Sequence, residues 1–369
     1  MTTTVEQQIT DLRRKSLQII RENQHESGSF IACPTFPQYH YSWLRDGTYI
    51  AYSLLLNGYR KECESFIQWC VNRIEQHAPK VERLPDLLKG SKRLHTSNFL
   101  SARYTLEGME DTSDWPNFQI DGYGSWLWLV AVYLKQEHIP LPRAWEAQVH
   151  TVITYLELVW RLPNSDCWEE FADKIHPSTL ACLAGGLKAV TPFIHGAFAR
   201  RSASLEQKIT GFILANQHPD GYFPKYIGSQ TIDASLIWLS VPYGVISPTH
   251  PAIVKTIEKI EREITIEGGV KRYPQDTYYG GGQWIILSAF LGWYYVKRGN
   301  IERARSLMNW IIRQQRDDGS LPEQVLEHTN EPSMIQPWEK RWGAVATPLL
   351  WSHAMFLILD HEVSVYNHT

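Results

Sequence analysis

Three short strings, QHESG at 24–28, QHPDG at 217–221 and QRDDG at 315–319, each follow a stretch with the apolar periodicity of a helix. Each string ends in glycine, which readily adopts the left-handed conformation of a helix C-cap, and an apolar residue follows two positions later. Their spacings of 193 and 98 residues are close to four and two units of about 49 residues. The repeat predicts six helical hairpins in series, closed into an all-α (α/α)6 barrel. Chance similarity between glycine-capped helices is the competing interpretation.

Apolar periodicity along the rest of the chain predicts about twelve helices and little strand. The expected helices cover residues 5–23, 45–58, 61–77, 121–137, 142–160, 176–190, 204–216, 232–243, 250–265, 282–298, 300–315 and 342–360. Long connections are expected at 78–120, 160–176, 217–231, 265–281 and 316–341. Because long loops in a compact domain usually carry function, we expect the functional site in loops at one end of the barrel. No linker-like stretch interrupts the chain, so residues 1–369 are expected to form a single domain.

The composition argues against several classes of protein. A net charge of −3 provides no basic surface for nucleic acid and no polybasic patch for a membrane. The N-terminal residues lack the pattern of a signal peptide, and the most apolar stretch, 126–134, is too short to cross a bilayer. We therefore expect a cytoplasmic protein whose five scattered cysteines are buried and unpaired. Both a monomer and a weak homodimer agree with this composition.

The aromatic content is the most unusual feature of the composition, with 15 Trp and 18 Tyr. Many of these residues lie near Gly, Pro or Asp in expected loops, where an aromatic ring can stack on the apolar face of a sugar. The histidines show no metal-binding spacing, and no nucleotide-binding or serine-nucleophile motif is present. No metal and no organic cofactor are therefore expected.

The string YHYSWLRD at 39–46 precedes an apolar helix and combines aromatic with charged residues. Arg45 is suited to donate hydrogen bonds to sugar hydroxyls, and Asp46 to accept them from a vicinal diol. Trp43 would supply a stacking face. The alternative is that Asp46 only caps the N-terminus of the helix.

The string DCWEEF at 166–171 places two adjacent carboxylates beside a tryptophan. The indole lowers the local dielectric and the neighbouring carboxylate opposes ionisation, so both raise the pKa of one carboxyl towards the range of a general acid. The alternative is an acidic first turn that interacts with a helix dipole.

The string GSLPEQ at 319–324 offers a third carboxylate, Glu323, in a loop that ring closure would bring to the same end as residues 166–171. An inverting glycosidase needs two carboxyl groups about 6.5–9.5 Å apart, with a water between one of them and the sugar. The alternative for Glu323 is an ordinary solvated loop carboxylate.

Two more loops combine polar, aromatic and glycine residues. The segment 268–284 contains KRYPQDTYYGGGQW, whose glycines would allow the backbone to approach a ligand closely, and QIDGYG at 119–124 is similar in character. Gln119, Asp121 and Asp276 are the candidate substrate-binding side chains of these loops. Phosphate binding at a helix N-terminus is the competing interpretation of 268–284, but the segment lacks the ending of a P-loop.

In these strings the sequence resembles glycoside hydrolase family 15, the glucoamylase family. The matching segments are YHYSWLRD (39–46), QIDGYG (119–124), CWEEF (167–171), KRYPQDTYYGGGQW (271–284), LPEQ (321–324) and TPLLWSH (347–353). They occur in order from about residue 37 to 357, nearly the whole chain. The resemblance implies an (α/α)6 barrel and hydrolysis from the non-reducing end of an α-glucan, with inversion to β-glucose.

Position by position, the resemblance assigns Glu169 as general acid and Glu323 as general base. It implies that the substrate-binding residues of the terminal glucose subsite are Arg45, Asp46, Glu170 and Arg272. It implies that the walls are formed by Tyr39, Trp43, Trp115 and Trp168, with Trp284 as a further member. Stretches 78–118 and 325–341 match no family segment. They would shape the subsites beyond the first glucose.

The expected activity is that of an exo-acting α-glucosidase that releases glucose from short α-1,4- or α-1,6-linked oligosaccharides. The expected partner is a small α-gluco-oligosaccharide, with no nucleic acid and no membrane. A trehalase of the same family is the nearest alternative, because it would use the same carboxylates. A non-hydrolytic sugar-binding or regulatory domain is the alternative from another class, although both carboxylates are present here. A helical-repeat scaffold that binds proteins is less well supported.

Overall fold

The computed structural model describes residues 5–90 and 94–366. The first four residues of the stretch inspected for a signal peptide, and residues 91–93 within the expected loop 78–120, lie outside these ranges. Within the described ranges, no helix has both the length and the apolar composition needed to cross a membrane. All five cysteines are buried and unpaired, which confirms the expectation for them.

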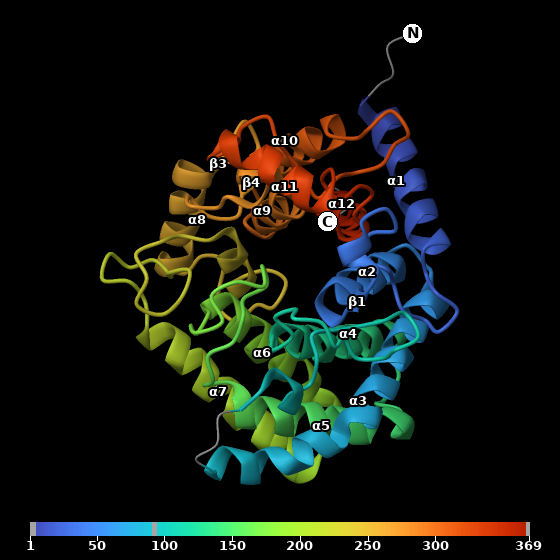
Figure 1. The fold of residues 1–369 in the computed structure, drawn as a ribbon, viewed down its shortest axis with the longest axis vertical. Coiled ribbons are helices and arrows are strands. Elements are labelled where there is room, and N and C mark those ends of the chain that lie inside the picture. Colours follow the sequence, from blue (N-terminus) through green and yellow to red (C-terminus); the bar gives the residue numbers. More distant parts are fainter. Residues whose placement is uncertain (1–4, 91–93, 367–369) are drawn as a thin grey trace.

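An inner ring of six segments forms the middle of the fold (Figure 1). The segments are α2 (Leu44–Leu56), α4 (Asp121–Glu137), α6 (Pro177–Val190), the 3-10 helix η4 (Ala234–Leu239), α9 (Ile285–Lys297) and α12 (Leu350–Tyr366). Each packs against the next, and α12 packs against α2, so the ring is closed. Helices with neighbours on every side are apolar all round. In α2, accordingly, every residue from Leu44 to Leu55 is buried.

Six outer helices surround this ring. They are α1 (Val5–Glu22), α3 (Arg60–Lys89), α5 (Arg143–Val159), α7 (Gly196–Ala215), α8 (Pro251–Ile264) and α10 (Ile301–Arg313). Unlike the inner segments, they are amphipathic. In α8, the buried residues Ile253, Ile257, Ile260 and Ile264 recur every three or four positions and form one apolar stripe. Outer and inner segments alternate along the chain, which confirms the predicted (α/α)6 barrel.

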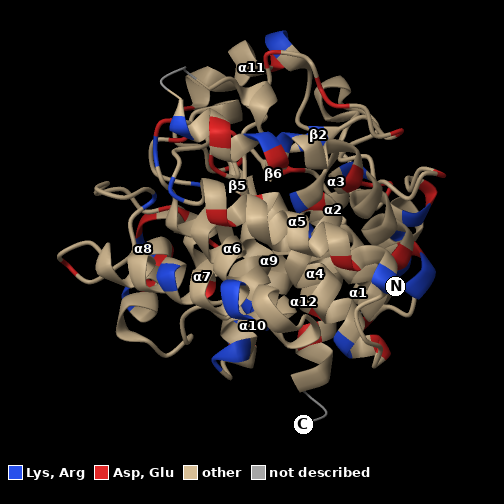
Figure 2. Cartoon of the chain, turned by 90° about the horizontal axis from the view of Figure 1, so that it is seen from below, with Lys and Arg blue, Asp and Glu red and all other residues tan. Residues whose placement is uncertain are grey.

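The long connections gather at one end of the barrel. Each joins an outer helix to the next inner segment, as residues 23–43 do between α1 and α2, whereas only residues 57–59 join α2 to α3. Two antiparallel sheets tie these loops together: β1 (Ser42–Trp43) with β2 (Arg103–Tyr104), and β3 (Thr265–Ile266), β4 (Gly269–Lys271), β5 (Gln283–Trp284) and β6 (Gln324–Val325) in that order. Figure 2 shows β2, β5, β6 and the short helix α11 (Ile335–Trp342) together on one side of the barrel.

Several helix boundaries differ from the expectation. Helix α3 continues to Lys89 through the expected loop, because Val81 and Leu84 are buried in the core despite Pro79 and Pro85 within the helix. Residues 232–243 form only the short η4. Helix α7 begins at Gly196 rather than 204, and α12 begins at Leu350 rather than 342. Helix α11 lies in the expected loop 316–341. The remaining 3-10 turns are η1 (Pro37–Tyr39), η2 (Thr96–Asn98), η3 (Thr191–Phe193), η5 (Tyr278–Gly280) and η6 (Pro332–Met334).

The three glycine-ended strings adopt one common conformation, which supports the repeat. Gly28, Gly221 and Gly319 have φ values of 97°, 82° and 78°. Each amide donates to the carbonyl three residues earlier, as Gly28 N does to His25 O at 2.9 Å. The prediction of a helix C-cap was wrong, because each glycine lies beyond the end of its helix. The left-handed glycine instead closes a tight turn with the geometry of a type I turn plus G1 bulge.

Two glycines allow α4 and α6 to approach closely. A Cβ atom on Gly124 would lie 2.5 Å from the Cys182 carbonyl oxygen, and one on Gly186 would overlap the carbonyl of Gly124. Since both obstacles are backbone atoms, neither side can yield without moving a helix. This close approach sets the spacing of two inner helices that lead out of site loops.

We predict that Gly124→Ala and Gly186→Ala each lower the thermal unfolding midpoint, by an amount equivalent to about 1–3 kcal/mol of overpacking. Gly211→Ala is the matched control, because a Cβ there meets no atom within 4 Å and the residue lies inside α7. That control should raise the midpoint slightly, since alanine favours a helix by up to about 1 kcal/mol. Calorimetric scans of the three variants provide the comparison. Equal midpoints for Gly186→Ala and the wild type would contradict the packing argument.

Candidate active site

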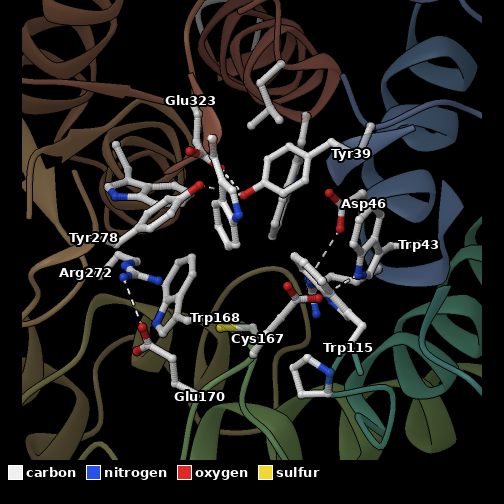
Figure 3. Close-up of a pocket in the computed structure, with 18 of the residues that line it drawn as sticks. Tyr39, Trp43, Asp46, Trp115, Cys167, Trp168, Glu170, Arg272, Tyr278 and Glu323 are labelled. Atoms are coloured by element: carbon white, nitrogen blue, oxygen red, sulfur yellow. Dashed lines mark hydrogen bonds and ion pairs between the residues drawn. The ribbon is translucent and has the colours of Figure 1, made fainter. Parts of the chain in front are cut away.

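A cavity of about 310 Å³ opens among the long loops (Figure 3). Eleven of the residues predicted from the sequence line it: Tyr39, Trp43, Arg45, Asp46, Trp115, Trp168, Glu169, Glu170, Arg272, Trp284 and Glu323. Arg45 and Asp46 belong to the first turn of α2, and the other nine come from five different connections, which the closed ring brings to one end. The cavity is at the lower end of the size range of small-molecule pockets.

The carboxylate of Glu169 is fixed by two donors on one of its oxygens. Trp43 Nε1 donates to Oε1 at 2.7 Å, and Gln119 Nε2 donates to the same atom at 3.0 Å. Gln119 is itself held by Arg45, whose NH1 donates to its side-chain oxygen at 2.9 Å. The described residues place no donor on Oε2, the second oxygen of Glu169, so it is the one available to a ligand.

Asp166 holds the backbone of the loop that carries Glu169. Its Oδ1 accepts hydrogen bonds from the amides of Trp168 and Glu170, each at 3.0 Å. Glu169, which lies between these two residues, has a φ of 68°. Phe171, which follows Glu170, has a φ of 51°. Such left-handed backbone is strained for a residue with a side chain and persists only where the surroundings impose it.

Those surroundings include a buried ion cluster under the loop. Lys225 Nζ lies 2.9 Å from Asp166 Oδ2 and 2.6 Å from Asp233 Oδ2, with all three side chains at most 3% exposed. Asp233 also accepts from Trp168 Nε1 at 3.0 Å. The two carboxylates raise the pKa of Lys225 despite its burial, which favours the charged form. The cluster therefore fixes both the backbone and the indole beside Glu169.

Glu323 lies on another wall and is buried. Tyr39 OH donates to its Oε1 at 2.8 Å, and Tyr278 OH lies 3.1 Å from the Tyr39 hydroxyl (Figure 3). Its Oε2 is buried and has no hydrogen-bond partner among the described residues. Burial raises the pKa of Glu323 to about 8, although the Tyr39 hydrogen bond and the charge of Arg272 act in the opposite direction.

The backbone around Glu323 is held by α12. His353 Nε2 accepts from Leu321 N at 2.9 Å, and Ser352 Oγ donates to Pro322 O at 2.8 Å. Burial lowers the pKa of His353 to about 3, so the ring is neutral and its Nδ1–H faces Ser16 Oγ at 2.8 Å. Strand β6, which follows Glu323, pairs with β5. These contacts fix the position of Glu323 in the wall.

Asp46 and Arg45 form a third polar group in the cavity. Asp46 Oδ2 is buried without a hydrogen-bond partner among the described residues, and its distance to Arg45 Nε is 3.4 Å. Burial raises the pKa of Asp46 to about 7, while Arg45 opposes this rise. Buried polar atoms normally have partners, so Asp46 Oδ2 and Glu323 Oε2 are positions where ligand hydroxyls fit.

Glu170 and Arg272 face the cavity beneath the aromatic wall. Arg272 NH2 lies 3.3 Å from Glu170 Oε1, and Arg272 Nε donates to Asp276 Oδ2 at 2.7 Å. Tyr273 OH donates to the other oxygen of Glu170. The guanidinium lies 5.4 Å from the ring centroid of Trp168, within cation–π range. Burial raises the pKa of Glu170, against the charge of Arg272.

Three of the predicted substrate-binding residues lie behind the cavity wall. Gln119, Asp121 and Asp276 are at most 1% exposed and are absent from the described lining. Gln119 and Asp121 accept from Arg45, and Asp276 accepts from Arg272, so they orient the residues that face the cavity. Direct contact of these three side chains with substrate therefore stays a prediction, and the structure shows them as partners of residues that line the cavity.

Sequence reasoning missed other lining residues. These include Asp114, Cys167, Arg341 and Trp342, whereas Tyr278 and Trp338 are among the aromatic residues expected in loops but were not assigned to the site. Tyr278 lay inside a matched string, and its place beside Tyr39 depends on folding. Ile335, Trp338 and Trp342 recur at helical spacing, so their periodicity could have revealed α11.

The cavity brings five carboxyl groups, three arginines and several aromatic rings around one space. Glu169 and Glu323 come from different walls and have different environments, the condition for one to act as acid and the other as base. Among the described residues, no group of three or more His, Cys, Asp or Glu could hold a metal ion. The carboxyl side chains that line the cavity offer acid–base chemistry on a sugar-like ligand.

Residues 12–360 match the family described as Glycosyl hydrolases family 15. Isomaltose glucohydrolase of Kribbella flavida is 36% identical over 359 residues, which are 96% of this chain and 93% of that protein. Trehalase 1 of Sulfolobus acidocaldarius is 22% identical over 286 residues, which are 74% of this chain and 49% of that protein.

Solved structures of a glycosidase and a glucoamylase also superpose on this chain. A glycosidase in complex with glucose is 34% identical and superposes with a TM-score of 0.93, covering 97% of each chain. The glucoamylase of Saccharomycopsis fibuligera superposes with a TM-score of 0.77 at 15% identity, covering 99% of this chain and 96% of that one. At 15% identity, the likeness to the glucoamylase shows the fold alone. The glycosidase at 34% identity is a relative whose structure contains glucose.

Replacing Lys225 tests whether the ion cluster supports the acidic loop. Lys225→Met leaves Asp166 and Asp233 buried without their cation, so we predict a loss of about 3–5 kcal/mol in the free energy of unfolding. Lys174→Met is the control, because Lys174 pairs with the exposed Asp173 and such pairs contribute about 0–1 kcal/mol. Chemical denaturation of both variants measures the difference. A Lys225→Met variant as stable as the control would contradict a structural role for the cluster.

Proposed function

The chain belongs to glycosyl hydrolases family 15 and is a glycoside hydrolase, and from this we propose that it releases glucose from the non-reducing end of short α-gluco-oligosaccharides with inversion. The observation that carries the proposal is the pair of glutamates on different walls of one cavity, Glu169 and Glu323. Inverting glycosidases act through such a pair, one carboxyl protonating the leaving group and the other activating water. A purely sugar-binding role receives no support from the family match.

Glu169 is the proposed general acid. Trp43 and Gln119 hold its Oε1, so the free Oε2 would carry the proton to the glycosidic oxygen as the C1–O bond breaks. Glu323 is the proposed general base. Its Oε2 would take a proton from water as the water oxygen bonds to C1 from the opposite face. The proton lost by the acid leaves with the alcohol product, and the base receives one from the water.

Asp46, Arg45, Arg272 and Glu170 are the proposed ligands of the terminal glucose, with Trp43, Trp168 and Trp284 as apolar walls. Asp46 Oδ2 would accept from a sugar hydroxyl, since it is buried without a partner among the described residues. Trp168 and Trp284 contact each other with ring centroids 5.4 Å apart and would present apolar faces to the pyranose.

An α-1,6-linked glucose disaccharide is the favoured substrate of this proposal. The support is the relative named isomaltose glucohydrolase, which this chain matches over most of the length of both. Trehalose is the second candidate, since relatives named trehalases are 22–27% identical to this chain. We further propose that residues 1–369 act as one domain in the cytoplasm, as a monomer or weak homodimer. This proposal includes no metal or organic cofactor.

Glutamine variants test the two catalytic assignments. We predict that Glu169→Gln and Glu323→Gln each lower kcat for glucose release from isomaltose by at least about 100-fold, because each removes a proton-transfer group. Glu327→Gln is the control, since Glu327 is an exposed carboxylate four residues after Glu323. Isomaltose, maltose and trehalose in parallel identify the linkage. Wild-type rates in either site variant would contradict its role, and trehalose as the only substrate would favour the second candidate.

Tyr39→Phe tests the electrostatics of the base. The Tyr39 hydrogen bond lowers the pKa of Glu323, which burial holds near 8, and a base must be ionised to act. Removing the hydroxyl raises that pKa further, so we predict that the acid limb of kcat/KM against pH moves to higher pH by about one unit. Tyr41→Phe is the control, because Tyr41 lies two residues away and is absent from the described lining. An unmoved acid limb would contradict the coupling between Tyr39 and Glu323.

A further inference from the structure

Helix α11 lies over the mouth of the cavity, in a stretch that resembles no family segment. Its residues Trp338, Arg341 and Trp342 line the cavity, together with Asp114, Trp115 and Pro116 from the loop before α4. Figure 2 places α11 beyond β5 and β6, on the outer side of the loop end. A sugar that continues from the terminal glucose towards solvent therefore meets these two segments.

The two segments touch across the mouth. The ring centroids of Trp115 and Trp342 are 6.1 Å apart, with an angle of 28° between the planes. Aromatic rings at this separation are in direct contact, so a pyranose cannot pass between them. Both residues line the cavity and are partly exposed, so the Trp115–Trp342 pair forms a bar between the cavity and solvent.

Both tryptophans of this bar are held in place by neighbouring side chains. The Arg103 guanidinium lies 3.7 Å from the ring centroid of Trp115, and Asp111 holds Arg103 at 2.7 Å with both side chains at most 3% exposed. Such a desolvated cation–π contact is worth about 2 kcal/mol. Trp115 is therefore held in place and does not need a ligand to order it.

Helix α11 is anchored by the tyrosine turn beside the proposed base. Trp338 contacts Tyr278 with ring centroids 5.0 Å apart, and Trp342 contacts the same ring at 6.1 Å. Tyr279 OH donates to Gly343 O, just after the helix, at 2.8 Å. The position of α11 is thus tied to the residues that surround Glu323.

Two charged side chains at this mouth have no ion-pair partner in the described part of the chain. Asp114 and Arg341 are both exposed and line the cavity from its two sides. Arg341 lies 4.9 Å from the ring centroid of Trp342. The Asp114 carboxylate only accepts hydrogen bonds and the Arg341 guanidinium only donates them, so together they suit the hydroxyls of a neutral sugar. An anionic substituent would meet the charge of Asp114.

We propose that α11 and residues 114–116 form a leaving-group subsite for one neutral sugar ring, and that the Trp115–Trp342 pair ends the binding site after that ring. The enzyme would then act on glucose disaccharides in preference to longer chains. This inference rests on the proposed function and adds to it the length of the substrate and the residues that set it. The small volume of the cavity, about 310 Å³, supports a short ligand.

The first test compares isomaltose, isomaltotriose and isomaltotetraose. The wild type should show kcat/KM for the disaccharide at least about tenfold above that for the longer substrates, which corresponds to about 1.4 kcal/mol. Trp342→Ala should bring the three values within about threefold of each other, because it opens the bar. Comparable wild-type values for all three lengths would overturn this inference and leave the proposed function intact. No glucose from any α-glucoside would instead overturn the proposed function.

The second test keeps the inference falsifiable if Trp342→Ala does not fold. Arg341→Ala should raise KM for isomaltose by about tenfold and KM for α-glucosyl fluoride by much less, because that substrate carries no leaving-group sugar ring. Lys340→Ala is the matched control, since Lys340 is exposed, adjacent and absent from the described lining. Equal KM values for isomaltose in Arg341→Ala and Lys340→Ala would overturn the role of Arg341 in a leaving-group subsite.

Discussion

The burial of the Glu323 carboxyl is the constraint on which the rest of the site depends. One oxygen accepts from Tyr39, and the other has no partner among the described residues, so an ionised Glu323 costs folding free energy. Its folded pKa lies above the ordinary value, so stability falls as pH rises from about 4.5 towards 8. The contacts of His353 and Ser352 with the preceding backbone hold the carboxyl in place despite this cost. A sugar and a water would complete its hydrogen bonds, so stability and function oppose each other here.

The position of Glu169 is set by the backbone conformation of its loop rather than by burial of its carboxyl. Its left-handed φ of 68° is imposed by Asp166, which the buried Lys225 holds from below. Trp43 then fixes one oxygen and leaves the other free. The two carboxyls therefore differ in environment, one oriented by hydrogen bonds in a strained loop and the other desolvated in a wall. The closed inner ring, with its close approach of α4 and α6, keeps both walls at a fixed separation.

The sequence predicted the barrel and most of the cavity lining, for identifiable reasons. The glycine strings marked a real repeat of turns, although not the helix caps that we expected, because the left-handed residue lies beyond each helix end. Lys225 was missed because its ion cluster joins Asp233 to Asp166, which is 59 residues from Lys225, and local patterns do not reveal such clusters. Local sequence made Glu323 an ordinary loop carboxylate, and only the family resemblance suggested its role. Helix α11 was missed because Pro337 and the polar residues around it resemble a loop, and tertiary contacts with Tyr278 and Tyr279 stabilise it.

The central claim is that Glu169 and Glu323 act on opposite faces of the terminal glucose, with water attacking beside Glu323. The anomer of the first glucose released tests this most directly, because the stereochemistry records the face of attack. Isomaltose mixed with enzyme and followed at once by proton NMR, before mutarotation, should show β-glucose as the initial product. Initial α-glucose would mean retention of configuration and would contradict the account.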